Sequence, residues 1–324
     1  LYTTVVHAIL YDMVRMMLKS LKALAFLTAI LAVLAAIWFA VFAGSGFLNI
    51  DTEKIDESYP VGEGTTLYVE SSFGKIDIST YNGTQIKLVG EKNTNFGDSE
   101  LDRIDLNVET GKYFLIDIDN NDYWWVWFSL DIRIPDYVKI KEVNLINGEL
   151  EIEGTSGSLD IDIRNGDMSV RKHNGNVYAD CEDGNVEIID LDGNLTVDQK
   201  SGELDVIGVS GVVDVELNSG EMKMKDINTL RSVSVDSGSL DIQFDNIHRD
   251  GGEINSDFGE VRVRIPMNLS CRLDIKADMG DIIIENLAVD WVRNEEMEKV
   301  GTIGDGGPIL RIRLGFGEIT LEGI

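Results

Sequence analysis

The chain has 324 residues, 44% of them hydrophobic, which is enough to bury a real core in one large or two modest domains. A formal net charge of −29 repels nucleic-acid phosphates, so the composition argues against a DNA or RNA partner. With two cysteines and three scattered histidines, the sequence offers neither a disulfide scaffold nor a zinc cluster.

An apolar segment near the start of the chain predicts a membrane anchor. Residues 23–43, ALAFLTAILAVLAAIWFAVFA, contain no charged side chain. At ~1.5 Å rise per residue, a helix of this length spans the ~30 Å hydrocarbon layer of a bilayer. A cleaved signal peptide is the alternative. The apolar run exceeds the usual length of about 7–15 residues for such a peptide, which favours an uncleaved anchor.

The charges on either side of this segment predict its orientation. Three basic side chains precede it, Arg15, Lys19 and Lys22, and with Asp12 they give residues 1–46 a net charge of +2. All other residues together then carry −31. The positive-inside rule therefore predicts that residues 1–22 are cytoplasmic or interfacial. Residues 23–46 would form the transmembrane helix, and the C-terminal domain would lie outside the cell.

The centre of the chain is a repeat with a period of nine residues. Each repeat has a glycine preceded by Asn, Asp or Ser, which are turn formers, and the glycine supplies a positive φ. The glycines are Gly148, Gly157, Gly166, Gly175, Gly184, Gly193, Gly202, Gly211 and Gly220. The residues two and four places after every glycine are apolar, and the positions between them are mostly polar. This alternation predicts short strands with one buried face.

We predict an all-β solenoid with strand units of about nine residues and coils of about 18 residues. A coil packs its two faces on each other, and stacking penalises insertions, which explains the constant period. An antiparallel β-meander or sandwich remains the alternative, because Asn-Gly and Asp-Gly also form hairpins. The predicted divisions are an N-terminal capping β region at 47–140, the repeats at 141–290, and a C-terminal loop with capping strands at 291–324.

Less regular units extend the pattern on both sides. Gly238 continues the period, while Phe258-Gly259, Met279-Gly280 and Phe316-Gly317 follow it and Phe73-Gly74 precedes it. Phe or Met replaces the polar turn residue in these outer units, which predicts atypical units that cap the stack.

Four passages resemble a known family: LYVESSFGKIDIST (67–80), DIRIPDYVKIKEVNLINGELEIEG (131–154), VRVRIPMNLSCRLDIKADMGDIIIENL (261–287) and GDGGPILRIRLGFGEITLEG (304–323). They are similar to the putative-adhesin β-strand-repeat family of bacterial and archaeal cell-envelope proteins. The resemblance covers about residues 60–324. It implies a membrane-anchored envelope protein of mostly unassigned role, with no catalytic residues to transfer. The aromatic stretch NDYWWVWFSLD (121–131) departs from the family pattern.

One column of acidic residues is a candidate calcium site. Asp162, Asp180, Asp198 and Glu216 occupy the same outward position in alternate units. In a coil they would stack ~4.8 Å apart, where like charges repel and Ca²⁺ would relieve the repulsion. The GGxGxD signature of calcium-binding β-rolls is absent. A solvated acidic face without any cofactor is therefore the favoured reading.

The remaining candidates concern contacts and modification. The aromatic residues that could contact a partner, or cap the solenoid, are Tyr123, Trp124, Trp125, Trp127 and Phe128. The N-glycosylation sequons are at Asn82, Asn194 and Asn268. Cys181 and Cys271 fall at inward positions, which favours buried free thiols over a disulfide.

Function follows from shape, because the sequence shows no reactive centre. It contains no GxSxG, HExxH or P-loop motif. We therefore predict a non-catalytic structural, adhesion or interaction surface of the cell envelope, held in lipid by residues 23–43. The alternatives are an accessory subunit of a membrane protein complex and, third, a polysaccharide-active enzyme. Pull-down of protein partners would distinguish the first two.

Overall fold

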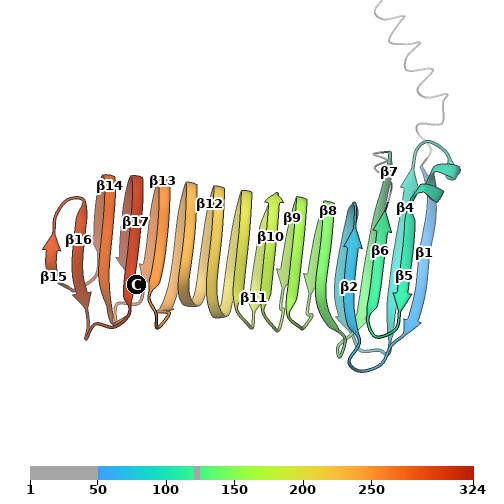
Figure 1. Cartoon of the computed structure of the whole chain (residues 1–324), viewed down its shortest axis with the longest axis horizontal. Helices are drawn as coiled ribbons and strands as arrows, with labels where there is room; N and C mark the ends of the chain where they lie inside the picture. Colours follow the sequence, from blue (N-terminus) through green and yellow to red (C-terminus); the bar gives the residue numbers. More distant parts are fainter. Residues whose placement is uncertain (1–49, 120–124) are drawn as a thin grey trace, which may run out of the picture.

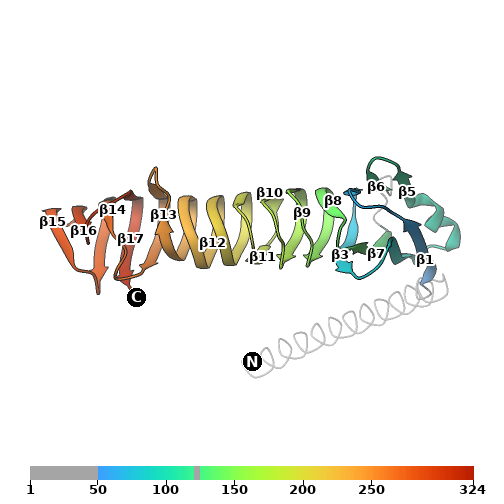
Figure 2. The same ribbon diagram turned by 90° about the horizontal axis from the view of Figure 1, so that it is seen from below.

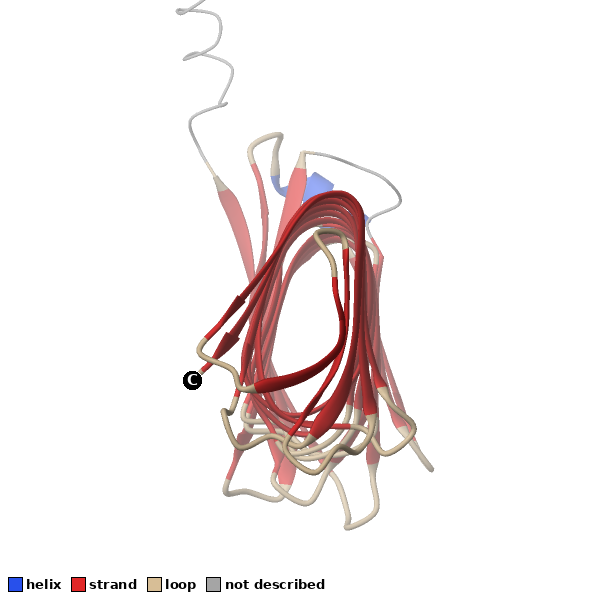
Figure 3. Ribbon diagram, turned by 90° about the vertical axis from the view of Figure 1, so that its left-hand side faces the viewer, coloured by secondary structure: helices blue, strands red, loops and turns tan. Residues whose placement is uncertain are grey.

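The computed structural model describes residues 50–119 and 125–324. They form a long stack of β-coils (Figures 1 and 2). Seen along the axis of the stack, each coil is a flattened ring (Figure 3). No helix in the described residues is both long and apolar enough to cross a membrane. The anchor predicted at residues 23–43 lies outside the described residues.

Seventeen strands and one short 3-10 helix build the described chain. The elements are β1 Asp51–Pro60, β2 Thr66–Ser71, β3 Gly74–Tyr81, β4 Gln85–Thr94, η1 Asp98–Arg103, β5 Asp105–Thr110, β6 Phe114–Asp119, β7 Val126–Pro135, β8 Lys139–Glu153, β9 Leu159–Arg171, β10 Val177–Asp183, β11 Val186–Leu191, β12 Leu195–Ile247, β13 Gly252–Ile265, β14 Cys271–Glu285, β15 Val289–Asn294, β16 Glu298–Ile303 and β17 Ile309–Gly323. The 53-residue β12 runs without interruption through several coils.

The central pairings are parallel and offset by 18 residues, as the solenoid requires. Val177 of β10 lies between Leu159 of β9 and Leu195 of β12, and Val186 of β11 pairs with Leu204. A meander would pair neighbouring strands antiparallel, so that alternative is wrong for the repeats. Antiparallel pairing occurs near the two ends, as between β1 and β4 or β14 and β16.

The core follows from the alternation in the repeats. The apolar residues two and four places after the nine glycines are all buried, and Val215 is the most exposed at 4%. They belong to one continuous hydrophobic cluster that runs from Ile55 in β1 to Leu321 in β17. Each coil thus covers its neighbours' apolar side chains, and the hydrophobic effect drives the stacking.

The repeat glycines form two columns, one on each edge of the stack. We call the edge where Gly148, Gly166 and Gly184 lie the corner edge; it forms the upper rim of the stack in Figure 1. A Cβ on Gly166 would lie 1.7 Å from the carbonyl oxygen of Gly148, and one on Gly184 would lie 1.9 Å from that of Gly166. Successive backbones therefore meet where no side chain fits.

Gly193 and Gly211 correct the expectation that every repeat glycine takes a positive φ. Neither has a positive φ, unlike the other seven. Each is nevertheless packed against the glycine of the preceding coil: a Cβ on Gly193 would lie 2.0 Å from the carbonyl oxygen of Gly175. At these two positions close backbone approach, rather than backbone conformation, requires glycine.

At each end a segment distant in sequence is inserted into the stack. At the C-terminal end, β17 lies between β13 and β14 and pairs in parallel with both (Figure 1). At the N-terminal end, β3 lies between β7 and β8, and β2 lies between β6 and β8. After β7, and again after β13, the chain therefore leaves one strand position in the stack empty. β2 and β3 fill the first position, and β17 fills the second.

Both empty positions follow an Ile-Pro dipeptide. Pro135 ends β7, and Pro266 follows β13. A turn follows each proline. The Pro135 carbonyl oxygen accepts a hydrogen bond of 2.9 Å from the Val138 amide, and the Pro266 carbonyl oxygen accepts one of 2.9 Å from the Leu269 amide. Proline lacks an amide donor, so it suits the end of a strand. The IP passages at 131–154 and 261–287 therefore mark the places where the chain leaves a gap.

Replacing Gly184 tests the backbone contact at the corner edge. Gly184→Ala would force a Cβ against the Gly166 carbonyl at a φ of +147°. We expect the free energy of unfolding to fall by roughly 3 kcal/mol, measured by urea denaturation. Gly62→Ala is the matched control, since a Cβ there meets nothing within 4 Å. Equal stabilities of the two variants would contradict the account.

Engineered disulfides test the insertion of β17. Thr320 of β17 pairs with Arg262 of β13 on one side and Ile283 of β14 on the other. Adjacent strands bring Cα atoms to about 5 Å, within disulfide reach, whereas strands two places apart are beyond about 7 Å. We expect Thr320→Cys to cross-link with either Arg262→Cys or Ile283→Cys.

The control is the pair Arg262→Cys and Ile283→Cys without a cysteine at position 320. It should stay reduced, as judged by non-reducing mass spectrometry. Efficient bonding in that pair would place β13 beside β14 and refute the insertion.

Candidate functional site

The structure places three of the four acidic candidates in register. Asp180 of β10 pairs with Asp162 of β9 on one side and Asp198 of β12 on the other. Asp162, Asp198 and Glu216 are exposed, and Asp180 is half-buried. Burial raises the pKa of Asp180, and the charges of Asp198 and Asp162 raise it further. The column thus carries the repulsion expected from the sequence.

A shallow hollow adjoins this column. It has a volume of about 210 Å³ and is lined in part by Asp198, Asp214 and Glu216. Asp214 forms an ion pair with Arg231. Across residues 50–119 and 125–324, no group of three or more carboxylate, imidazole or thiol side chains has the geometry to hold a metal ion. Calcium binding therefore stays a prediction.

The aromatic stretch divides into buried and exposed side chains. Tyr123 and Trp124 lie outside the described residues. Phe128 is buried on β7 and packs against Phe73 with ring centroids 6.1 Å apart, while Trp127 points outward and is 40% exposed. Trp125 is half-buried, and its indole Nε1–H donates to Glu100 at 2.9 Å. This stretch therefore contributes both to the end of the core and to the surface.

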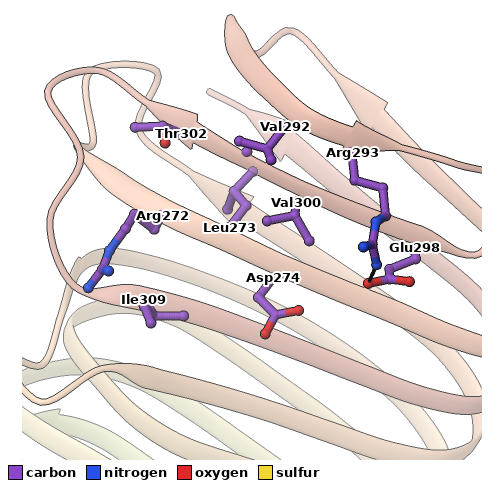
Figure 4. Close-up of a pocket in the computed structure, with 10 residues that line it drawn as sticks. Arg272, Leu273, Asp274, Val292, Arg293, Glu298, Val300, Thr302 and Ile309 are labelled. Atoms are coloured by element: carbon purple, nitrogen blue, oxygen red, sulfur yellow. Dashed lines mark hydrogen bonds and ion pairs between the residues drawn. The ribbon is translucent and has the colours of Figure 1, made fainter.

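The C-terminal end of the stack contains a hollow that was not predicted from the sequence. It has a volume of about 460 Å³ and lies over β14, β15 and β16, beside the start of β17 (Figure 4). Its carboxylates are ion-paired: Asp274 lies 2.7 Å from Arg313, and Glu298 pairs with Arg293. The charged residues that alternate with apolar ones in RLD at 272–274 and RIR at 311–313 were the available sequence signal. Val292, Val300 and Ile309 give the hollow an apolar part.

The C-terminal hollow does not present a recognisable catalytic arrangement. A hydrolase needs a nucleophile beside a base, or two carboxyl groups facing each other across a substrate. The carboxylates of the C-terminal hollow instead face arginines from neighbouring strands, as they would in a structural ion-pair network.

The buried cysteines and histidine are structural. Cys181 and Cys271 are free and buried, as predicted, and burial raises the pKa of each thiol to about 11. Both thiols therefore stay protonated and unreactive at neutral pH. His173 is buried, and its ring nitrogens contact the Thr155 hydroxyl at 2.8 Å and the Gly157 carbonyl oxygen at 3.0 Å. Burial lowers the pKa of His173.

Comparison with protein families matches nearly the whole described chain. One family model aligns twice, with residues 37–225 and with residues 194–322. The chain belongs to the Toastrack DUF4097 family. The family resemblance seen in the glycine units and IP passages is confirmed. No curated protein sequence matches this Toastrack chain.

Solved structures also align with the Toastrack chain. A "putative cell adhesion protein" from Clostridium sporogenes ATCC 15579 is 12% identical, with 84% of this chain and 100% of that chain covered and a TM-score of 0.22. A "putative adhesin" from Bacteroides fragilis NCTC 9343 is 13% identical, with 83% and 97% covered and a TM-score of 0.31. A "putative lipid binding protein" from Parabacteroides distasonis ATCC 8503 is 15% identical, with 86% and 96% covered and a TM-score of 0.25.

The three sequons lie on the surface of the Toastrack stack. Asn82, Asn194 and Asn268 are exposed. Asn194 also belongs to a ladder, because its Oδ1 accepts a hydrogen bond of 2.8 Å from the amide of Val212. The backbone amide of Asn194 donates a hydrogen bond to Oδ1 of Asn176 at 3.1 Å. Glycosylation at these three positions stays a prediction.

Neutralising Asp180 tests the energetics of the acidic column. The pKa of Asp180 is raised in the folded state, so its ionised form costs stability once the pH exceeds the unfolded pKa of about 3.9. We expect Asp180→Asn to raise the free energy of unfolding at pH 7 by about 0.5–1 kcal/mol. The gain should shrink as the pH is lowered toward 4. Urea denaturation at a series of pH values measures it.

Asp56→Asn is the matched control for this experiment. Asp56 is exposed on β1 and pairs with Val89 rather than with another carboxylate. We expect Asp56→Asn to change the free energy of unfolding little at any pH in the series. A loss of stability in Asp180→Asn at pH 7 would contradict the proposed repulsion.

Proposed function

We propose that this Toastrack protein is a single-pass membrane protein that presents a rigid, non-catalytic β-solenoid outside the cell as a structural, adhesion or interaction surface of the envelope. The observation that carries the proposal is the combination of an uninterrupted stack with a charged exterior and an uncharged 21-residue segment, residues 23–43, ahead of it. The first supplies a stiff surface and the second supplies an anchor.

The exterior supports binding through shape and charge rather than turnover. Its outward rows carry carboxylates, amides and hydroxyls in regular columns, as in the pairing of Asn147 with Asn165. Many of its basic groups are engaged within the chain: Lys75, for example, binds Glu149 at 3.1 Å and Glu151 at 2.9 Å. Such a surface suits partners or ions recognised along the stack, with residues repeated at each rung.

Topology can be tested by labelling cysteines in intact cells. We expect a membrane-impermeant maleimide to label Ser210→Cys, an exposed site in the stack, without permeabilisation. Thr3→Cys, before the predicted span, should be labelled only after permeabilisation. The two native thiols are buried and have raised pKa values, so the unsubstituted chain is a clean control. Labelling of Ser210→Cys only after permeabilisation would refute the outside location.

The non-catalytic role is tested separately. The purified full chain should release no products from a panel of envelope glycans. Its pull-down from detergent-solubilised membranes should separate a lone surface protein from an accessory subunit with stoichiometric partners. Turnover of any glycan that is abolished by substitution in the C-terminal hollow would replace this proposal with an enzymatic one.

A further inference from the structure

Three large apolar side chains are exposed in a row at the corner edge. Phe258, Phe316 and Met279 are 60%, 54% and 57% exposed. Phe316 pairs with Phe258 on one side and Met279 on the other, so the three occupy successive rungs. We call them the apolar column. Their side chains point outward rather than into the core.

This position is polar in the interior rungs of the stack. It is occupied by Asn147 and Asn165 at the start of the repeats and by Ser237 in the rung next to Phe258. Large exposed apolar clusters on an otherwise acidic protein indicate a contact surface. From Asn147 onward, the change from short polar to large apolar residues occurs only in the last rungs. At the N-terminal end Phe73 takes this position, since Gly74 pairs with Gly148, but Phe73 is half-buried against Phe128.

The described chain begins at the same edge. Asp51 of β1 pairs with Thr94 of β4, and Thr94 pairs with Val126 at the start of β7. Ser129 of β7 pairs with Lys75, which follows the corner glycine Gly74. The start of β7, and with it the start of β1, therefore lies at the corner edge. Phe96 and Trp127 are exposed there by 43% and 40%.

The tether fixes how far this end can lie from a bilayer. Seven residues, 44–50, lie between the apolar segment 23–43 and β1. Fully extended, they reach at most about 25 Å. The apolar column lies on the same edge at the far end of the stack, roughly 50 Å away at ~4.8 Å per rung. One edge therefore carries the membrane tether at one end and exposed apolar side chains at the other.

We propose that the solenoid lies along the outer surface of the bilayer, with its corner edge facing the lipid and the apolar column inserted at the headgroup level as a second contact. This inference rests on the membrane anchor of the proposed function. Aromatic and thioether side chains partition into this interfacial layer, and the tether holds them near it. The short polar residues between the two ends allow the edge to approach.

Charge argues against a second copy as the occupant. Asp257, Asp278, Glu260, Glu318 and Asp281 are exposed beside the apolar column. Two such surfaces facing each other would bring like charges together. The same carboxylates predict a lipid preference: contact should be stronger with zwitterionic phosphatidylcholine than with anionic phosphatidylglycerol.

The test places a fluorescent probe on the full chain in nanodiscs wider than the stack. Phe316→Cys carries the probe, and Met267→Cys is the matched control, because Met267 is 60% exposed and lies on the opposite edge. The buried native thiols should not react. We expect headgroup spin-labelled phosphatidylcholine to quench the probe at position 316 at least threefold more than at 267. Neutral acrylamide should quench position 316 less.

A second variant separates the apolar column from the tether. Phe258→Ser, Phe316→Ser and Met279→Ser together restore the residue type of the neighbouring rungs and leave the buried core untouched. A probe at Ser237→Cys, on the same edge, should then lose its lipid quenching. Replacing phosphatidylcholine with phosphatidylglycerol should lower it in the parent chain.

The contrary outcomes are distinct. Equal acrylamide quenching at 316 and 267 without lipid quenching would overturn the inference while leaving the anchor in place. If the probe at position 316 is shielded from both acrylamide and the spin-labelled lipid, the apolar column contacts a second copy of the chain, and the inference is also overturned. A chain that does not enter the discs at all would refute the anchor, and with it both proposals.

Discussion

The structure depends on backbone contact between glycines of successive coils. At the corner edge the carbonyl oxygen of one glycine lies where the next would carry a Cβ, as between Gly202 and Gly220, where the separation would be 1.8 Å. This contact lets the chain turn sharply at the same height in every coil. Because the turns coincide, the strands on both faces stay in parallel register, and the apolar side chains meet inside. A side chain at the corner would push adjacent coils apart and open the core along the strands.

A stack of coils must also be closed at its ends, and this chain does so by insertion. The terminal strands of an open stack would expose unpaired amides and carbonyls, which invite association. Here β17 pairs on both sides, and β2 and β3 do so at the other end. The short antiparallel β15, with a register shift between Trp291 and Arg293, then forms the last edge. A bulged, charged edge strand resists pairing with another chain.

The sequence predicts the regular part of this fold well. The spacing of nine and the strict alternation of apolar residues are direct consequences of stacking, so the coil, its 18-residue step and the inward residues could all be read from them. The inserted strands could not. Pairing of β17 with β13 joins residues such as Thr320 and Arg262, and nothing local to either strand specifies the partner. The ends of the stack are irregular because each strand there has a different neighbour.

The candidate sites divide in the same way. The acidic column follows from the period, so the stacking of Asp162, Asp180 and Asp198 could be predicted from the sequence. The hollow at the C-terminal end of the stack is lined by residues of β14, β15, β16 and β17, and its composition depends on pairings that the period does not encode. Likewise, the spacing of Phe and Gly alone does not reveal whether the Phe316 side chain points outward to solvent or inward to the core.

Distances between spin labels test the stacked order most directly. One spin label is placed at Asn147 and the second at one of four positions in the same column: Ser201, Ser237, Phe316 or Met279. Pulsed electron paramagnetic resonance should report distances between the two labels that grow by ~4.8 Å per rung. The account predicts that the distance to Met279 exceeds the distance to Phe316, although Met279 comes earlier in the chain. Separations that do not rise evenly along the column, or a longer distance to Phe316 than to Met279, would contradict it.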